Sequence, residues 1–450
     1  MTELVDLLPK TSMTVQAIFD SYKKAGDAES QRGYLGASII GHACSRYLWY
    51  NFRMCCQESF DGRMYRLFET GDKEERRFVS DLRQIAVQVH DVDENGRQFA
   101  VHAVGGHFSG HMDGCALGIP EAPKTWHVLE FKTHNAKSFA KLVKTGVKVA
   151  KPMHYAQMMV YMGLTGMTRA LYLAKNKDTD DLYSERVRFD KEEYSALMER
   201  AENIIRSPTP PQRISTREDY FECSWCPAHK LCWGCPGPAL PVPAINCRQC
   251  CHATPAMDGM AHWVCENYAR SLSDADQMAA CEDHLVLPGL ISFAEPTDFG
   301  NDDSSAGKDW IDFHNSSDPG AAPDWRHGAG PGCFTTKELM VLPADKLTNK
   351  FVQQTKDDFG AIAVGSSTDD ILLRYPESDC RIAFKGPIGL LRVEWQRLYG
   401  GEDIQAIEPI EKCEGFNYRA AEFPGGRAVI VWTEMTQIGS SNCEIRESVE

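Results

Sequence analysis

Two charged residues interrupt an apolar segment in the first third of the chain. In the run "HVLEFKT", Glu130 and Lys132 stand two positions apart, and Asp113 precedes Glu130 with sixteen residues between them. Charged side chains are rarely buried unless they are paired, bind a metal or take part in chemistry. Residues two apart on a strand point to the same face, so Glu130 and Lys132 are predicted to share one side of a sheet.

These residue types suit one kind of reaction. Two carboxylates that converge on one point, here Asp113 and Glu130, bind hard cations such as Mg²⁺ or Mn²⁺, and the Phe131 carbonyl is a further candidate ligand. A lysine beside them, Lys132, can orient or deprotonate a water molecule and offset the charge of a phosphate. Metal-assisted hydrolysis of a phosphodiester needs this set of groups. Taken alone, however, the spacing favours an ordinary ion pair.

Two further pairs of residues change that balance. Gln157 and Tyr161 are four apart in "HYAQMMVYM", one turn of a predicted helix, and therefore lie on one face. Glu75 follows Gly71 by four residues in a predicted helix with many charges. Glu75 is a candidate third metal-binding carboxylate, and the alternative is a surface acid of a mixed-charge helix.

The order of these residues resembles the PD-(D/E)XK nuclease superfamily, and within it the RecB-like exonucleases, including the CRISPR-associated RecB-like family. The resemblance covers roughly residues 35–235 and rests on Gly71, Glu75, Asp113, Glu130-Phe131-Lys132, Gln157 and Tyr161. It implies that Asp113 and Glu130 bind Mg²⁺ or Mn²⁺, that Lys132 is catalytic, and that Gln157 and Tyr161 lie beside DNA. The chain departs from the family at Glu75, where many relatives have His, and at Met112, where the pattern has Pro.

The resemblance implies a metal-dependent DNA exonuclease of bacterial or phage origin, in recombination, repair or phage DNA processing. DNA, including single-stranded ends, is the expected partner. One alternative is a structure-specific endonuclease, and another is a non-catalytic nucleic-acid-binding scaffold. No Walker-type phosphate-binding motif is found, which argues against an ATP-driven motor in this chain.

A row of lysines follows the central motif. Five of them recur at spacings of 4, 3, 4 and 3, which would place them on one face of a helix: Lys137, Lys141, Lys144, Lys148 and Lys151. Such a row is typical of a solvated helix face, but its position after the motif favours contact with a DNA backbone. The net charge of −15 argues against nucleic-acid binding by the whole surface.

The chain has 17 cysteines, an odd number that favours metal binding over disulfides in a cytosolic protein. Cys223, Cys226 and Cys232 form a C-x2-C-x5-C pattern that suits zinc or an iron–sulfur cluster. Cys235 would complete a local zinc site. In the RecB-like exonucleases that carry a cluster, one cysteine precedes the nuclease core, so the resemblance implies a [4Fe-4S] cluster on Cys44 and these three.

A second group of cysteines predicts a structural zinc site. The expected ligands are Cys247, Cys250, Cys281 and His284, with Cys265 as the alternative. The motif of zinc-dependent deaminases is absent, so we do not expect this zinc to be catalytic.

The predicted fold class is α/β, and the resemblance implies a restriction-endonuclease-like mixed sheet flanked by helices. We expect a RecB-like nuclease domain with the iron–sulfur cysteines at 1–240 and a Cys-rich zinc unit at 241–290. The Gly-, Asp-, Ser- and Pro-rich segment 291–333 is predicted to be a flexible linker. A small α/β unit of unknown role, with a helix at 388–399, would form 334–450.

The composition, with 43% hydrophobic and 25% charged residues, is typical of a globular protein, and 450 residues predict two or three domains. The N-terminus does not resemble a signal peptide, and no window approaches the roughly 18 apolar residues of a membrane span. We therefore expect a cytoplasmic protein that does not bind membranes. A protein partner, if one binds, is expected at the C-terminal half.

Overall fold

The computed structural model describes residues 12–234, 236–302, 308–315, 323–330, 332–348, 352–353 and 356, and the strands named below beyond residue 361. The chain forms two compact units, one from residues 1–222 with 255–264 and the other from 223–254 with 265–450. The proposed division at residues 240, 290 and 333 stays a prediction. No helix in the described part of the chain is both long and apolar enough to span a bilayer.

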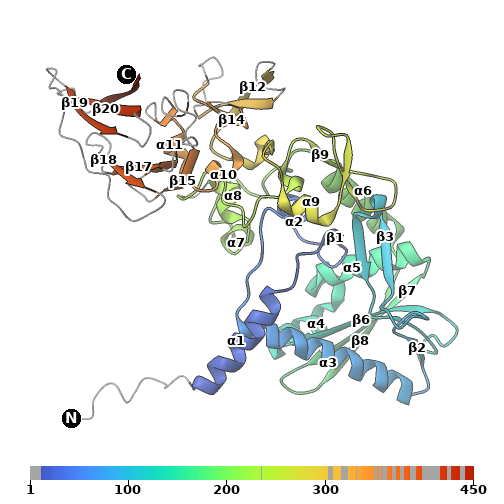
Figure 1. Cartoon of the computed structure of the whole chain (residues 1–450). Coiled ribbons are helices and arrows are strands. Elements are labelled where there is room, and N and C mark those ends of the chain that lie inside the picture. Colours follow the sequence, from blue (N-terminus) through green and yellow to red (C-terminus); the bar gives the residue numbers. More distant parts are fainter. Residues whose placement is uncertain are drawn as a thin grey trace, which may run out of the picture. The chain divides into compact units, whose positions relative to one another are not determined.

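The first unit contains the carboxylate and lysine residues of the predicted nuclease motif, and Figure 1 labels most of its helices and strands. Its elements are α1 (Met13–Asp27), β1 (Leu35–Gly36), α2 (Ser45–Phe52), α3 (Gly62–Gln84), β2 (Gln88–His90), β3 (Ala100–Ala103), β4 (Phe108–His111), β5 (Cys115–Leu117), β6 (His127–His134), α4 (Ala136–Ala150), α5 (Pro152–Thr165), β7 (Arg169–Asn176), β8 (Leu182–Arg188) and α6 (Lys191–Arg206).

A five-stranded mixed sheet with the order β2-β5-β6-β7-β8 organises this unit. β6 and β7 are parallel, with Glu130 paired to Tyr172, whereas the other neighbouring strands are antiparallel. Because β6 and β7 are parallel, the chain between them must cross the sheet, and α4 and α5 form that crossover. The predicted α/β class, with a mixed sheet flanked by helices, is confirmed.

The two faces of β6 have different environments. Leu129 and Phe131 pack into a buried cluster with Phe78, Val79 and Leu82 of α3. The rings of Phe78 and Phe131 stack with centroids 5.1 Å apart. Since side chains alternate along a strand, Glu130 and Lys132 point to the opposite face. The apolar cluster on the α3 face thus fixes the strand from which the charged pair projects.

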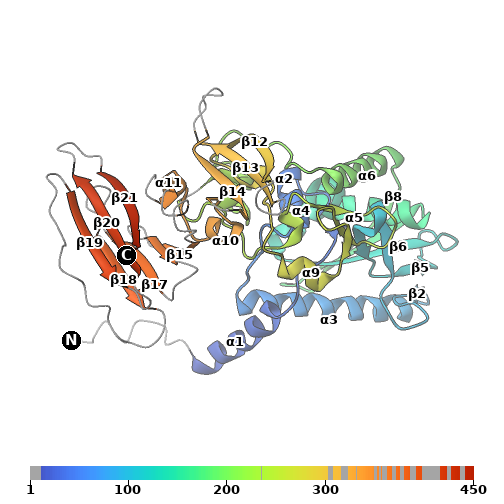
Figure 2. The ribbon, with the colours of Figure 1, turned by 45° about the horizontal axis from the view of Figure 1, so that its top comes forward.

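Short polar residues begin the helices around the sheet. Asp61 caps α3 by accepting a hydrogen bond from the Met64 N–H at 2.7 Å, and Asn135 caps α4 through Ser138 at 2.8 Å. α1 packs beside the first half of α3, as both ribbon views show (Figures 1 and 2). Gly62 is required at this contact, because a Cβ there would collide with the Phe19 carbonyl.

In its described residues, the second unit contains short elements and, beyond residue 294, three antiparallel sheets. Its elements, with α7, β9 and β10 at the junctions with the first unit, are α7 (Phe221–Ser224), α8 (His229–Trp233), η3 (Cys247–Gln249), β9 (Ala253–Pro255), β10 (Trp263–Cys265), β11 (Arg270–Leu272), α9 (Asp274–Ala279), η4 (Pro288–Leu290), β12 (Glu295–Asp302), β13 (Lys308–His314), β14 (Trp325–Gly328), α10 (Thr336–Leu339), α11 (Ala344–Leu347), β15 (Ile362–Ser366), β16 (Ile371–Arg374), β17 (Cys380–Lys385), β18 (Arg392–Arg397), β19 (Phe416–Glu422), β20 (Arg427–Met435) and β21 (Ser441–Val449). β19, β20 and β21 lie side by side (Figure 2).

Two predictions for this unit are wrong. The segment 291–333, expected to be a linker, contains the sheet β12-β13-β14. Apolar residues hidden among Gly, Asp and Ser build it: Ile311 and Phe313 are fully buried, and Phe313 stacks on Trp325 with centroids 4.5 Å apart. The predicted helix at 388–399 contains strand β18, which pairs with β17. Its sequence "RVEWQR" alternates polar and apolar residues, and this alternation is typical of a strand.

Candidate active site

The central charged residues meet where the end of β4 lies beside the middle of β6. Asp113 follows β4, and its Oδ2 accepts a hydrogen bond of 2.7 Å from the Phe131 N–H in β6. This bond places the Asp113 carboxylate beside Glu130, the neighbouring residue on the same strand. The structure therefore brings together Asp113, Glu130 and Lys132, which are separated in the sequence.

Glu130 has an unusual environment for a carboxylate. Its side chain is 0% exposed, and within the described residues neither of its oxygens has a hydrogen-bond partner. Lys132 Nζ lies 2.5 Å from Glu130 Oε1 as an ion pair outside hydrogen-bond geometry, and donates a hydrogen bond of 3.0 Å to the Phe131 carbonyl. A buried carboxylate needs more compensation than this single contact.

The electrostatics show a surplus of negative charge at this point. Burial raises the pKa of Glu130, Lys132 opposes that rise, and the Asp113 carboxylate reinforces it. Burial also raises the pKa of Asp113. For Glu75 on α3, burial and then the Asp113 charge raise the pKa to about 7. Burial would lower the pKa of Lys132, but Glu130 and Asp113 outweigh it and raise that pKa.

This donor set suits a hard divalent cation. The Glu130 oxygens, which accept no hydrogen bond from the described residues, and the neighbouring Asp113 carboxylate are ligands that Mg²⁺ and Mn²⁺ prefer. Glu75 interacts electrostatically with both of them. Across the described ranges, no three His, Cys, Asp or Glu side chains are grouped so that they could hold a metal. A cation here would therefore rely on two close carboxylates, with Glu75 farther away.

The helix α5 supports the site from the sheet face that bears Glu130. Tyr161 donates a hydrogen bond of 2.7 Å to the His111 carbonyl, and Gln157 Nε2 donates to the Tyr161 hydroxyl at 3.1 Å. Because His111 ends β4, these bonds hold the strand from which Asp113 projects. Tyr161 is 1% exposed and Gln157 6% exposed. Their predicted DNA contact stays a prediction, and the contacts seen here position Asp113.

A buried network beside Lys132 was missed from the sequence. The hydroxyl of Tyr172 hydrogen-bonds to His134 Nε2 and to His154 Nδ1, each at 2.9 Å. Burial, with nearby lysines, lowers the pKa of His134 to about 4 and that of His154 to about 2, so both rings are neutral near pH 7. Pairing of β6 with β7 places Tyr172 opposite Glu130, but that register could not be read from the sequence.

The lysine row lies on α4 but not on one continuous helix. Gly146 has φ +72° and breaks the helix, and the Val147 N–H beyond it bonds to Glu185 at 2.8 Å. The expectation of a single stripe is therefore wrong, because a glycine in the left-handed region redirects the chain. Lys137, Lys141 and Lys144 precede the break and are exposed.

The two remaining lysines lie beyond that break. Lys148 is 3.9 Å from both Asp190 and Glu193 and lies over the Tyr155 ring. Its charge is therefore already paired with neighbouring side chains. Lys151 is half-buried at the start of α5, where its charge helps lower the pKa of His134. Lys151 is thus the member of the row nearest to the buried network.

The proposed iron–sulfur ligands belong to different units. Cys44 caps α2 in the first unit, where its Sγ accepts a hydrogen bond of 3.4 Å from the Tyr47 N–H. Cys223, Cys226 and Cys232 belong to the second unit, around α7 and α8. Cys235 lies outside the described residues. The cluster stays a prediction.

The second cysteine group favours the alternative ligand over the histidine. Burial and then the nearby Cys281 and Cys265 thiols raise the pKa of Cys247 to about 11. His284 uses both ring nitrogens elsewhere, with Nε2 3.0 Å from the Asn246 carbonyl and Nδ1 2.9 Å from Thr336 Oγ1. These contacts favour Cys265 over His284 as the candidate beside Cys247, Cys250 and Cys281, and the zinc site stays a prediction.

Comparison with known proteins gives limited similarity. No protein-family model matches the chain, and no curated protein matches it in sequence. Among solved structures, that of SSO0001 is similar with a TM-score of 0.32 and 15% identity, over 49% of this chain and 96% of the other. LHK-Exo, an alkaline exonuclease from Laribacter hongkongensis, also solved in complex with dAMP, is similar with a TM-score of 0.30 and 16% identity, over 41% of this chain and 90% of the other.

Proposed function

We propose that the chain is a metal-dependent DNA nuclease of the PD-(D/E)XK type, and more specifically a RecB-like exonuclease. The observation that supports it is Glu130, a fully buried carboxylate whose oxygens have no hydrogen-bond partner among the described residues, next to Asp113 and Lys132. A purely structural ion pair would be expected to satisfy its buried oxygens. A site that is incomplete without a ligand is expected at a functional centre.

The chemistry divides among the chain's residues and a cation. Asp113 and Glu130 would hold Mg²⁺ or Mn²⁺, with the Phe131 carbonyl and the more distant Glu75 as further candidate ligands, and the cation would supply a Lewis acid for the phosphate and the attacking water. Lys132 keeps its proton because Glu130 and Asp113 raise its pKa. It therefore acts as a cation that orients the water and stabilises the charge that develops on the phosphate oxygens. Water attacks phosphorus, the bond between phosphorus and the deoxyribose oxygen breaks, and the proton released by the water is balanced by protonation of the leaving oxygen.

The substrate follows from the cationic surface near this centre. The exposed Lys137, Lys141 and Lys144 lie on the crossover helix that follows β6 directly. Such lysines bind phosphates without reading the sequence of bases. We therefore expect DNA strands of any sequence to bind there, with an affinity that falls as salt rises.

End-labelled single- and double-stranded DNA, incubated with Mg²⁺, Mn²⁺ or a chelator, tests the proposal. Metal-dependent loss of label is expected for the native protein and should disappear in Lys132→Ala, whereas Lys177→Ala, at an exposed lysine after β7, should cut normally. Anaerobic purification protects any iron–sulfur cluster during the test.

The same assay separates the alternatives. Cutting of circular DNA would identify an endonuclease, because an exonuclease needs a free end. Uncut DNA under every metal condition, from folded protein that still binds DNA, would favour the non-catalytic scaffold.

The cysteine sites are further proposals with their own measurements. We propose a [4Fe-4S] cluster on Cys44, Cys223, Cys226 and Cys232, which predicts iron, sulfide and visible absorbance in anaerobically purified protein. Cys44→Ser should lose them, because Cys44 is the remote ligand. We also propose one structural Zn²⁺ on Cys247, Cys250 and Cys281 with Cys265. Elemental analysis should show that Cys265→Ser loses zinc and His284→Gln retains it.

A further inference from the structure

A cavity of about 730 Å³ opens between α1, α3 and the segment that leads into α2, all in the first unit. Its volume lies in the roughly 300–1,000 Å³ range of ligand sites. Aromatic rings contribute much of its lining, namely Tyr22, Tyr34, Phe60, Tyr65 and Phe68. Phe60, Tyr65 and Phe68 pack edge to face against one another, with centroids 5.0 to 6.0 Å apart.

Hydrogen bonds hold the tyrosine rings of this cavity in place. Tyr22 donates to Glu69 at 2.9 Å, and Tyr65 donates to Asp27 at 3.3 Å. Gly26 of α1 lies directly against the Tyr65 ring, where any Cβ would collide with it. The rings are therefore positioned before any ligand arrives, which lowers the entropic cost of binding a flat group against them.

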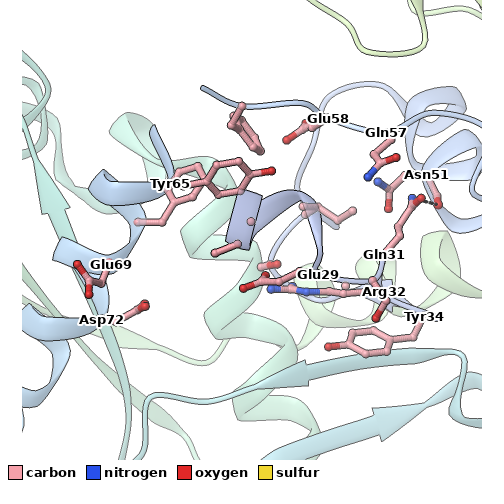
Figure 3. Close-up of a pocket in the computed structure, with 18 of the residues that line it drawn as sticks. Glu29, Gln31, Arg32, Tyr34, Asn51, Gln57, Glu58, Tyr65, Glu69 and Asp72 are labelled. Atoms are coloured by element: carbon pink, nitrogen blue, oxygen red, sulfur yellow. Dashed lines mark hydrogen bonds between the residues drawn. The ribbon is translucent and has the colours of Figure 1, made fainter. Parts of the chain in front are cut away.

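Amide and acidic groups complete the lining. Figure 3 shows Gln31, Asn51 and Gln57 on one side of the cavity and Glu69 and Asp72 of α3 on the other. Amides of this kind bind the edges of bases, and carboxylates accept hydrogen bonds from exocyclic amino groups.

The charge of the lining excludes a phosphate. Its charged residues are Glu29, Glu58, Glu69 and Asp72, with Arg32 as the cation. This surplus of carboxylates would repel a phosphate, whereas an uncharged base can enter.

The cavity lies next to the candidate active site. Asp72 lines it, and Asp72 is one helical turn before Glu75, whose pKa its charge helps raise. Tyr34 also lines it, and its hydroxyl is 3.4 Å from His111 Nδ1, two residues before Asp113. The cavity thus shares α3 with Glu75 and borders the end of β4, which leads to Asp113.

We propose that this cavity binds an unpaired base of the DNA strand whose phosphate lies at Asp113 and Glu130, an inference that rests on the proposed function. The phosphate stays at the cation site, and the neighbouring base stacks among the rings. A paired base cannot enter, because its edge and faces are occupied in the duplex. The site therefore selects single-stranded ends or flaps.

Binding of a labelled single strand to the full chain in chelator, where no cutting occurs, tests this proposal. Phe68, 43% exposed, can be truncated with little effect on the core, and Trp126, 38% exposed and outside this cavity, is the matched control. Phe68→Ala and Tyr34→Ala should each weaken binding about tenfold, the typical loss of one base–aromatic stack. Trp126→Ala should bind the single strand normally, and blunt duplex should bind all variants equally.

Strands with one abasic position identify the base that enters. At one position near the end, the abasic strand should bind about tenfold more weakly to the native protein and no more weakly to Phe68→Ala. If strands with the abasic position at each site all bind as tightly as the intact strand, the inference is wrong. It is also wrong if Phe68→Ala and Tyr34→Ala both bind the single strand normally. Binding of a lysine-rich peptide that depends on Glu58 and Glu69 would assign the cavity to a protein segment instead.

The cutting assay keeps the two proposals distinguishable. If the native protein cuts DNA with metal but binds every abasic strand as tightly as the intact strand, only the cavity inference fails. If the native protein cuts no DNA, yet one abasic position weakens binding as predicted, the nuclease proposal fails and the base-binding inference stands.

Discussion

Removal of the two members of the Glu130–Lys132 pair should destabilise the fold to very different extents, although both changes should abolish cleavage. Glu130 is 0% exposed, whereas the Lys132 side chain is 26% exposed. In Lys132→Met the carboxylate stays buried without its cation, and loss of one partner of a buried pair costs about 3–5 kcal/mol. In Glu130→Gln the lysine keeps its bond to the Phe131 carbonyl and reaches water, so the cost should be about 1 kcal/mol or less.

The size of the first effect depends on pH. Because burial raises the pKa of Glu130, and loss of Lys132 raises it further, the folded variant binds a proton more tightly than the unfolded chain does. Stability is therefore retained at low pH and lost as pH rises through the folded pKa. The deficit of Lys132→Met should grow from acidic to alkaline buffer. That of Glu130→Gln should shrink, because the native protein loses stability as the buried Glu130 ionises and the variant does not.

Hydrogen exchange of the β6 amides measures the loss of stability around the pair locally, without requiring that the whole chain unfold in one step. A loss of about 3 kcal/mol corresponds to roughly 150-fold less protection of the β6 amides in Lys132→Met at alkaline pH. Equal losses in the two variants, or a larger loss in Glu130→Gln, would refute the view that Glu130 is a buried carboxylate with too little compensation.

Three further outcomes are expected. Because the pKa of Glu75 rises from 4.5 to about 7, it contributes stability below about pH 4.5 that is lost as pH rises through 7, and Glu75→Gln should flatten this part of the melting profile of metal-free protein. Tyr161→Phe, which loses the 2.7 Å bond to the end of β4, should slow cleavage about tenfold without changing circular dichroism. Replacement of Lys137, Lys141 and Lys144 by Gln should reduce the salt dependence of single-strand binding by about 2 log units per log unit of salt, as titration would show.

The sequence was sufficient for much of the sheet that carries the site. Alternating apolar residues predicted β6, and the spacing of Glu130 and Lys132 predicted their common face, because a strand repeats every two residues. The helix that bears Glu75 was also predicted correctly. These features are local, so nearby residues determine them.

Features that depend on distant partners were not predictable. The Tyr172 hydroxyl reaches two histidines only because β7 lies parallel to β6 after a crossover of two helices. Gly146 looked like an ordinary helical residue, but the carboxylate of Glu185 captures the next N–H and favours a break. In the segment 291–333, composition suggested a linker, while the burial of Phe313 against Trp325 requires a pairing that composition does not reveal.

The zinc ligands show the same limit in another form. Cys265 and His284 are equally acceptable donors by spacing, so the sequence left both open. Their neighbours distinguish them: His284 has a carbonyl and a hydroxyl at its two nitrogens, while Cys265 lies near the thiols of Cys247 and Cys281. The choice between two ligands therefore depends on what else each side chain contacts.

A net charge of −15 is compatible with the proposed DNA substrate, because basic and acidic residues of the first unit lie on different surfaces. Lys137, Lys141 and Lys144 are exposed on α4, where phosphates would lie, whereas Glu69 and Asp72 line the cavity beside α3. A strand bound between these surfaces would be attracted through its backbone at one and would insert only uncharged bases at the other. Acidic surface elsewhere would disfavour non-productive DNA contacts, so most of the affinity would come from strands that enter the site.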